Sequence, residues 1–171
     1  IWGNKPGDFR EMSRQMFEEG FSGVDVNMVC PDKSVVKTHA GSGLIENPEL
    51  AIAILCAAQN GFYDYWREQN SEFAKLTDDE IRQKLPTWQI PVSVKTRLGA
   101  HRIDEFQQWL PILLNEHPAN LTIHLRTRKE MSKVPAHYEL LPEILRLRDE
   151  ISPQTLLTVN GDITSKADAI A

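Results

Sequence analysis

The stretch that decides the fold is VDVNMVCP, residues 24–31. Apolar and polar residues alternate along it, so Val24, Val26 and Met28 share one face of a predicted strand and the polar residues share the other. A proline ends the stretch and limits the strand to a few residues. Cys30 therefore lies just past the carboxyl end of a short strand with one apolar and one polar face.

Three later segments repeat this design: PVSVKTR at 91–97, LTIHLR at 121–126 and LLTVN at 156–160. Each alternates in the same way and carries its larger polar residues near its carboxyl end. Together the four strand ends offer these side chains: Asn27, Cys30, Lys95, Arg97, His124, Arg126, Asn160 and Asp162. Four polar strand ends in one chain are difficult to explain by packing alone.

Segments with helical spacing separate these strands, so strand and helix alternate through the chain. This alternation is typical of a parallel α/β fold. In a closed parallel barrel the apolar strand faces meet the surrounding helices, and functional side chains gather at the carboxyl ends of the strands. We therefore predict a partial (β/α)8 TIM barrel, with parallel strands alternating with helices, in which the eight side chains named above share one mouth.

Residues 61–90 interrupt this rhythm, because aromatic residues are interleaved there with many charges. The spacing of Thr77 and Glu80 fits a helix capping box. We expect a helical insertion of one or two extra helices in this range. Residues 31–43 are predicted to form a polar, glycine-bearing loop, and the helix after it is predicted to have Asn47 as its cap and a proline in its first turn.

Bulk properties narrow the class of protein. The chain has 171 residues, of which 41% are hydrophobic, enough for one domain with a core. Its net charge of -5 argues against a dedicated nucleic-acid module, which is usually basic. Cys30 and Cys56 are the only cysteines and lie in different settings, so we expect a reducing, cytoplasmic location.

The sequence also predicts no membrane anchor and no metal site. No apolar run approaches the length of a membrane span. The histidines other than His124 show no metal-ligand spacing. The chain opens without a methionine on what looks like the end of a strand, so we expect it to be a piece of a longer protein.

Each candidate residue, taken alone, also has a simpler structural interpretation. A cysteine after a strand is more often inert than catalytic. Lys95 could pair with Asp25 or Asp162 inside the barrel, and His124 could be a satisfied histidine of the barrel core. The Asn-Gly-Asp sequence at 160–162 could be a plain turn.

The combined motifs resemble the tRNA-dihydrouridine synthase family. DVNMVCP at 25–31 is similar to the cysteine motif of that family, and VKTRLG at 94–99 to its flavin-lysine strand. HLRTR at 124–128 resembles its histidine–arginine strand, and VNGDI at 159–163 resembles a later flavin strand. The segment KTHAGSG, followed by NPE at 47–49, resembles the loop and helix start after the cysteine. Order and spacing match over nearly the whole chain, apart from residues 61–90.

This resemblance implies an FMN-dependent reductase that converts uridine in tRNA to 5,6-dihydrouridine. NADPH would reduce the flavin, the flavin would pass hydride to C6 of the uracil ring, and an acid would protonate C5. By position, Cys30 would be that acid. The resemblance implies cofactor contacts by Lys95, His124, Asn160 and Asp162, and substrate contacts by Asn27, Arg97 and Arg126.

Two positions depart from the family pattern. Val29 and Leu125 stand where the family usually has glycine, and both are expected to add bulk near the mouth. The family is also longer than this chain. Residues 1–171 would form an incomplete TIM-barrel flavin-binding catalytic domain, without the first strand, the last strands and the C-terminal helical domain that binds RNA.

The residue types suit this chemistry. A thiol with an ordinary pKa of about 8.5 is mostly protonated at neutral pH and can act as an acid. A lysine can stabilise an anionic reduced flavin, and arginines suit uracil carbonyls or phosphates. Two alternatives stay open. The chain could belong to another TIM-barrel enzyme, an aldolase with Lys95 as the Schiff-base nucleophile. It could also be an inactive barrel fragment that binds FMN weakly or not at all and tends to associate.

Overall fold

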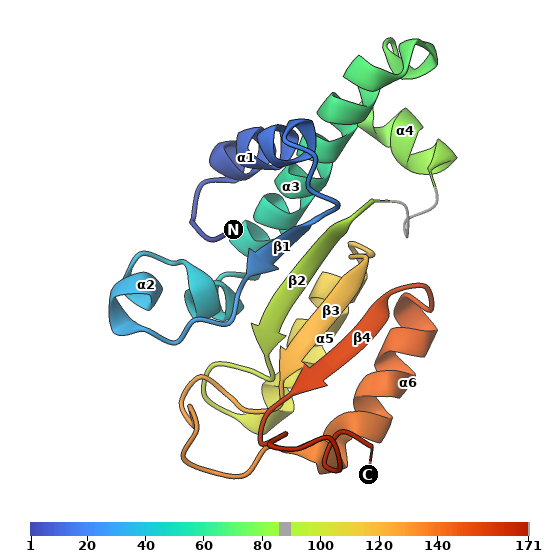
Figure 1. Cartoon of the computed structure of the whole chain (residues 1–171). Helices are drawn as coiled ribbons and strands as arrows, with labels where there is room; N and C mark the ends of the chain where they lie inside the picture. The colour runs from blue at the N-terminus through green and yellow to red at the C-terminus, as the bar shows by residue number, and fades with distance from the viewer. Residues whose placement is uncertain (86–89, 171) are drawn as a thin grey trace.

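The computed structural model describes residues 1–85 and 90–170. Trp88, which belongs to the predicted insertion, lies outside these residues. One parallel sheet has the strand order β1-β2-β3-β4. Its strands are β1 (Val24–Asn27), β2 (Val92–Arg97), β3 (Asn120–His124) and β4 (Leu156–Asn160). The helices are α1 (Pro6–Glu18), α2 (Lys33–Lys37), α3 (Pro48–Gln69), α4 (Asp78–Lys84), α5 (Phe106–Leu114) and α6 (Leu141–Ile151). All four strand arrows in Figure 1 point toward the end of the sheet near α2.

The register of the sheet aligns the apolar residues of neighbouring strands. Val26 pairs with Val94, Val94 with Leu121, and Leu121 with Leu157. The first three are completely buried, because α3, α5 and α6 cover this face (Figure 1). Strand and helix alternation with one apolar strand face confirms the predicted α/β architecture, a partial TIM barrel.

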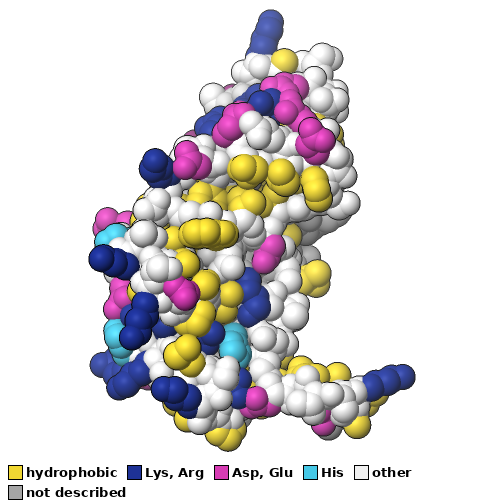
Figure 2. Space-filling view, turned by 60° about the vertical axis from the view of Figure 1, so that its left-hand side comes forward, with side chains coloured by type: hydrophobic (Ala, Val, Ile, Leu, Met, Phe, Trp, Pro, Cys, Tyr) yellow, Lys and Arg dark blue, Asp and Glu magenta, His cyan; other side chains and the backbone are white. Residues whose placement is uncertain are grey.

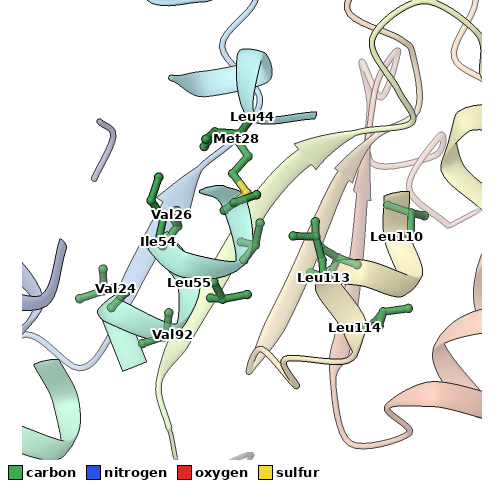
Figure 3. Packing of buried hydrophobic residues seen from close by; sticks show 14 of the residues in the cluster. Val24, Val26, Met28, Leu44, Ile54, Leu55, Val92, Leu110, Leu113 and Leu114 are labelled. Atoms are coloured by element: carbon green, nitrogen blue, oxygen red, sulfur yellow. The ribbon is translucent and has the colours of Figure 1, made fainter. Parts of the chain in front are cut away.

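The hydrophobic core lies between the sheet and the helices. Figure 3 shows Ile54 and Leu55 of α3 against the strand residues Val24, Val26 and Val92. Further along the sheet, α5 contributes three leucines that are at most 1% exposed: Leu110, Leu113 and Leu114. The apolar face predicted for each strand is therefore the face that holds the helices in place.

The start of α3 follows the sequence prediction. The side chain of Asn47 accepts a hydrogen bond from the backbone N–H of Leu50, and Pro48 is the first helical residue. The predicted start of the insertion is wrong, however, because α3 continues without a break to Gln69. Its apolar face continues past residue 61, where Phe62 packs against Phe17 of α1 and stacks on Trp66.

The added helical structure is therefore shorter than expected. Within the described residues up to Leu85, it consists of one short turn, Ser71–Phe73, and of α4. Thr77 and Glu80 form the predicted capping box at the start of α4. The segment 31–43 also differs from the prediction, because α2 lies within this loop and Asp32 caps it by accepting from the backbone N–H of Ser34.

Ile1 lies along the free side of β1. Its backbone oxygen accepts from Asn27 N at 2.8 Å, and its nitrogen donates to Asp25 O at 2.7 Å. This is the bonding pattern of a parallel ladder, as expected for the end of a strand. Among residues 1–85 and 90–170, none of the helices combines the length and the apolar character that a membrane-spanning segment needs.

The contact between α1 and α3 depends on Gly61. A Cβ atom at this position would lie 2.2 Å from the Arg10 backbone oxygen and 2.8 Å from Ser13 Cβ. The helices therefore pack with their backbones nearly in contact. Ion pairs lie beside this contact, from Asp64 of α3 to Arg10 at 2.6 Å and to Arg67 at 3.0 Å.

We expect Gly61→Ala to destabilise the protein by about 2 kcal/mol, because α1 must move away from α3 to make room for a methyl group. The midpoint and slope of urea unfolding measure this change. Gly7→Ala is the matched control, since a Cβ there would meet no atom within 4 Å, and it should leave stability unchanged or raise it by up to about 1 kcal/mol. Equal midpoints for the two variants would contradict this account of the helix contact.

Candidate functional site

Lys95 and Asn160 meet at the end of the sheet where all four strands have their carboxyl ends. We call this end of the sheet the carboxyl edge. Lys95 extends from β2 across β3 and donates from Nζ to Asn160 Oδ1 of β4 at 2.7 Å. Burial, followed by repulsion from Arg97, lowers the pKa of Lys95 to about 8, although the Asp25 carboxylate opposes this shift. The ammonium is therefore held in a partly buried position with an amide, not a carboxylate, as its hydrogen-bond partner.

His124 lies at the end of β3, opposite Asn160 in the register. Burial lowers its pKa to about 4, helped by the positive charges of Arg97, Lys95 and Arg126. Arg126 Nη1 lies 3.0 Å from His124 Nε2. A guanidinium can only donate, so Nε2 accepts and the neutral ring carries its proton on Nδ1.

Arg126 and Asp162 form an ion pair beside His124. The Arg126 guanidinium also donates to the backbone oxygen of Val134 at 2.6 Å, and the residue is only 4% exposed. The hydrogen bond from Arg126 lowers the pKa of the Asp162 carboxyl group. The same carboxylate also accepts a hydrogen bond from Ala136 N at 2.7 Å. Asp162 thus joins the loop after β3 to the turn after β4. The alternative in which Lys95 pairs with Asp162 is not what the structure shows.

Arg97 has protein partners as well. Its Nε donates to the backbone oxygen of Val29 at 2.9 Å, and its Nη1 donates to Thr127 O at 3.3 Å. The residue is 5% exposed. Its guanidinium therefore joins the segment that carries Cys30 to the loop after β3.

Cys30 is held through its backbone. Asn27 Oδ1 accepts from the N–H groups of Val29 and Cys30, each at 3.1 Å. The Cys30 carbonyl oxygen accepts from Ser42 N at 3.0 Å and from Ser42 Oγ at 2.8 Å. Neighbouring Gly41 has φ +55, and a Cβ there would lie 2.9 Å from the same oxygen. The thiol itself is free and partly buried.

Sequence reasoning missed the part that Ser42 plays. The sequence placed Ser42 only in a polar, glycine-bearing loop, whereas its hydroxyl group contacts Cys30, twelve positions away. Ser42 is completely buried. It belongs to the candidate site as a group that fixes the position of the cysteine segment.

The two departures from the family pattern lie in different places. The Leu125 side chain is completely buried in the hydrophobic core. The expectation that it adds bulk near the mouth is therefore wrong, because strand alternation continues past His124 and turns Leu125 away from the polar face. Val29 is partly exposed next to Cys30, so the expectation for this residue stays a prediction.

The structure thus brings the predicted residues together at one edge. One hydrogen bond connects Lys95 with Asn160. Two others connect Arg126 with His124 and with Asp162. The cysteine segment joins this edge through Arg97 and through pairing of Asn27 with Lys95 in the register. Among residues 1–85 and 90–170, no three His, Cys, Asp or Glu side chains form a group that could hold a metal ion.

Comparison with known proteins extends these observations. The family model described as dihydrouridine synthase matches residues 1–62 and 69–171. The unmatched residues lie within α3, so most of the range 61–90 that we interpreted as an insertion belongs to the matched region.

Curated bacterial relatives also match the chain over nearly all of its length. A probable tRNA-dihydrouridine synthase 2 of Bacillus subtilis (strain 168) is 47% identical over 166 residues, which are 97% of this chain and 43% of that protein. A probable tRNA-dihydrouridine synthase of Staphylococcus aureus (strain Mu50) is also 47% identical, over 97% of this chain and 42% of the relative. The chain therefore spans less than half the length of these relatives. By its match over nearly all of its residues, the chain belongs to the dihydrouridine synthase family.

Proposed function

We propose that this chain supplies the proton donor and part of the FMN site of an enzyme that reduces uridine in tRNA to 5,6-dihydrouridine. One observation carries the proposal: Cys30 and the pair of Lys95 and Asn160 lie at the same carboxyl edge of one parallel sheet. Active sites of TIM barrels form at this edge. The names of the relatives, probable tRNA-dihydrouridine synthases, agree with the proposed reaction.

The donor groups at the carboxyl edge fit a flavin ring. The ring presents nitrogen and oxygen acceptors, and three donors are available to them. Lys95 supplies an ammonium, Asn160 supplies its amide N–H groups because its oxygen already accepts from Lys95, and His124 supplies Nδ1–H. We propose that these three residues contact FMN, with Lys95 placing positive charge beside the part of the ring that becomes anionic.

When bound, FMN supplies the hydride for C6 of the uracil ring after reduction by NADPH. The residues of this chain handle the proton. We propose that Cys30 donates its thiol proton to C5, and that water then restores it. Asn27 binds the N–H group of Cys30 and Ser42 binds its carbonyl oxygen. The backbone that carries the thiol is therefore already fixed before the uracil binds.

Arg97, Arg126 and Asp162 take positioning roles in this proposal. Both guanidiniums are anchored to backbone oxygens, and Arg126 also binds the Asp162 carboxylate. Fixed charges of this kind stabilise negative charge at low reorganisation cost. We propose that the remaining N–H groups of the arginines and the Asn27 side chain face the uracil, and that Asp162 acts on the cofactor through Arg126 and His124.

The scope of the proposal follows from the length of the chain. Since the chain spans less than half of its relatives, we propose residues 1–171 as one part of a TIM-barrel flavin-binding catalytic domain. The other parts of the protein would complete the FMN site and bind the body of the tRNA. NADPH as the reductant and a cytoplasmic location remain predictions.

We expect Cys30→Ala in the FMN-loaded protein to keep flavin reduction by NADPH within about twofold. Reoxidation of the reduced flavin by unmodified tRNA should fall by about 10²-fold or more, the usual contribution of a positioned acid. Stopped-flow absorbance of the flavin measures the two half-reactions separately.

Cys56→Ala is the matched control for this experiment. Cys56 lies in α3, where its thiol donates to Glu116 at 3.1 Å and burial raises its pKa to about 11. Both half-reactions should be unchanged in this variant. Equal loss in the two half-reactions of Cys30→Ala would contradict the assignment of Cys30 as the acid.

The proposed role of His124 requires a neutral ring. Its folded-state pKa of about 4 lies below the ordinary value of 6.5, so the unfolded chain binds more protons between these pH values. The titration of His124 should therefore not affect the free energy of unfolding above about pH 6.5. It should lower this free energy progressively as the pH falls from 6.5 toward 4. The Cε1 proton resonance of His124 should shift with a midpoint near pH 4.

His137 provides the contrast within the same protein. Burial opposes its charge, but hydrogen bonds with Glu139 and Glu130 outweigh burial and raise its pKa above 6.5. The two histidines should therefore titrate on opposite sides of pH 6.5 in one spectrum. A midpoint for His124 at or above that of His137 would exclude the neutral donor proposed here.

A further inference from the structure

A basic groove lies outside the carboxyl edge, beside the cysteine segment. It has a volume of about 410 Å³, and its lining includes Pro31, Lys33, Lys37, Arg128 and Lys129. Three different loops contribute to it, those that follow β1, β2 and β3. Figure 2 shows Lys and Arg side chains gathered along this side of the molecule.

The charge of the basic groove is opposite to that of the chain. The whole sequence has 24 Asp and Glu residues against 19 Lys and Arg, yet the described lining of the groove contains no carboxylate. Arg128 is paired with Glu46 at 2.7 Å. The side chains of Lys33, Lys37 and Lys129 form no ion pair with any carboxylate among the described residues, and all three are exposed.

The groove is fixed relative to Cys30. Pro31, the residue after the cysteine, is one of its lining residues. Ser42 donates to the Cys30 carbonyl oxygen. The Ser42 carbonyl oxygen in turn accepts a hydrogen bond from Arg128 Nη1 at 3.2 Å. On the other side, Lys129 N donates to Ala100 O at 3.0 Å. These contacts join the loops that line the groove to the segment that carries Cys30.

We propose that the basic groove binds phosphates of the RNA strand next to the target uridine. The inference rests on the proposed function. A base that reacts at a barrel mouth must leave its stack, while the adjoining backbone stays outside. Unpaired lysines are point charges that suit phosphates of any sequence. The groove thus adds to the tRNA contacts of the protein from within the catalytic part of the chain.

The experiment compares two triple variants of the full-length, FMN-loaded protein. One replaces the three groove lysines: Lys33→Gln, Lys37→Gln and Lys129→Gln. The control replaces three exposed lysines outside the groove: Lys5→Gln, Lys75→Gln and Lys84→Gln. Both lower the net charge by the same amount. Fluorescence anisotropy with an unmodified tRNA transcript, at several salt concentrations, gives the Kd and its salt dependence.

The groove variant should bind the transcript at least about tenfold more weakly, and the slope of log K against log salt should fall by about 2 to 3. The control should change the Kd by no more than about twofold. NADPH reduction of the flavin should be the same in all three proteins, with the same KM for NADPH. Flavin content and the far-ultraviolet spectrum show that each variant is folded.

Two results would overturn the inference. An unchanged Kd and slope in the groove variant would show that the lysines do not meet RNA. A raised KM for NADPH with unchanged RNA affinity would assign the groove to the phosphates of the dinucleotide. Failure of the proposed function is a separate result: the wild-type protein would not reduce the transcript, while the loss of RNA affinity in the groove variant would still support the groove.

Discussion

The hydrogen bond between Lys95 Nζ and Asn160 Oδ1 depends on the register of three strands. Lys95 pairs with Thr122, and Thr122 pairs with Thr158, so the ammonium reaches two residues farther along β4. A shift of one residue in any strand would turn one partner toward the helices. The burial of alternating apolar residues therefore fixes the polar site, although none of those residues lies in it.

Positive charge is concentrated at the carboxyl edge. Lys95, Arg97 and Arg126 lie around His124, and their repulsion, added to burial, lowers the pKa of that ring to about 4. Burial and repulsion from Arg97 also lower the pKa of Lys95. Such an edge is suited to the proposed flavin ring, which gains negative charge on reduction. Asp162 balances part of the charge through Arg126, which keeps the guanidinium in place instead of removing its field.

The cysteine segment is organised differently from the charged groups. Its geometry comes from one side-chain amide, Asn27, and from the buried Ser42 and Gly41, which approach the Cys30 carbonyl from another loop. Arg97 then binds the Val29 oxygen and connects this segment to the charged edge. The proposed acid and the proposed flavin contacts are thus joined through Arg97 and through the pairing of the strands that carry them.

The sequence by itself determined the strands, their faces and the candidate residues, because period-two alternation and the residue that ends each strand are local properties. It also predicted the cap of α3 at Asn47 and the capping box of α4. Only the tertiary structure decided which partners the arginines take, where the Leu125 side chain lies, and how far α3 extends. These depend on contacts between residues that are far apart in the chain, such as Gly61 with Arg10 or Ser42 with Cys30, and such contacts leave no periodic signal in the sequence.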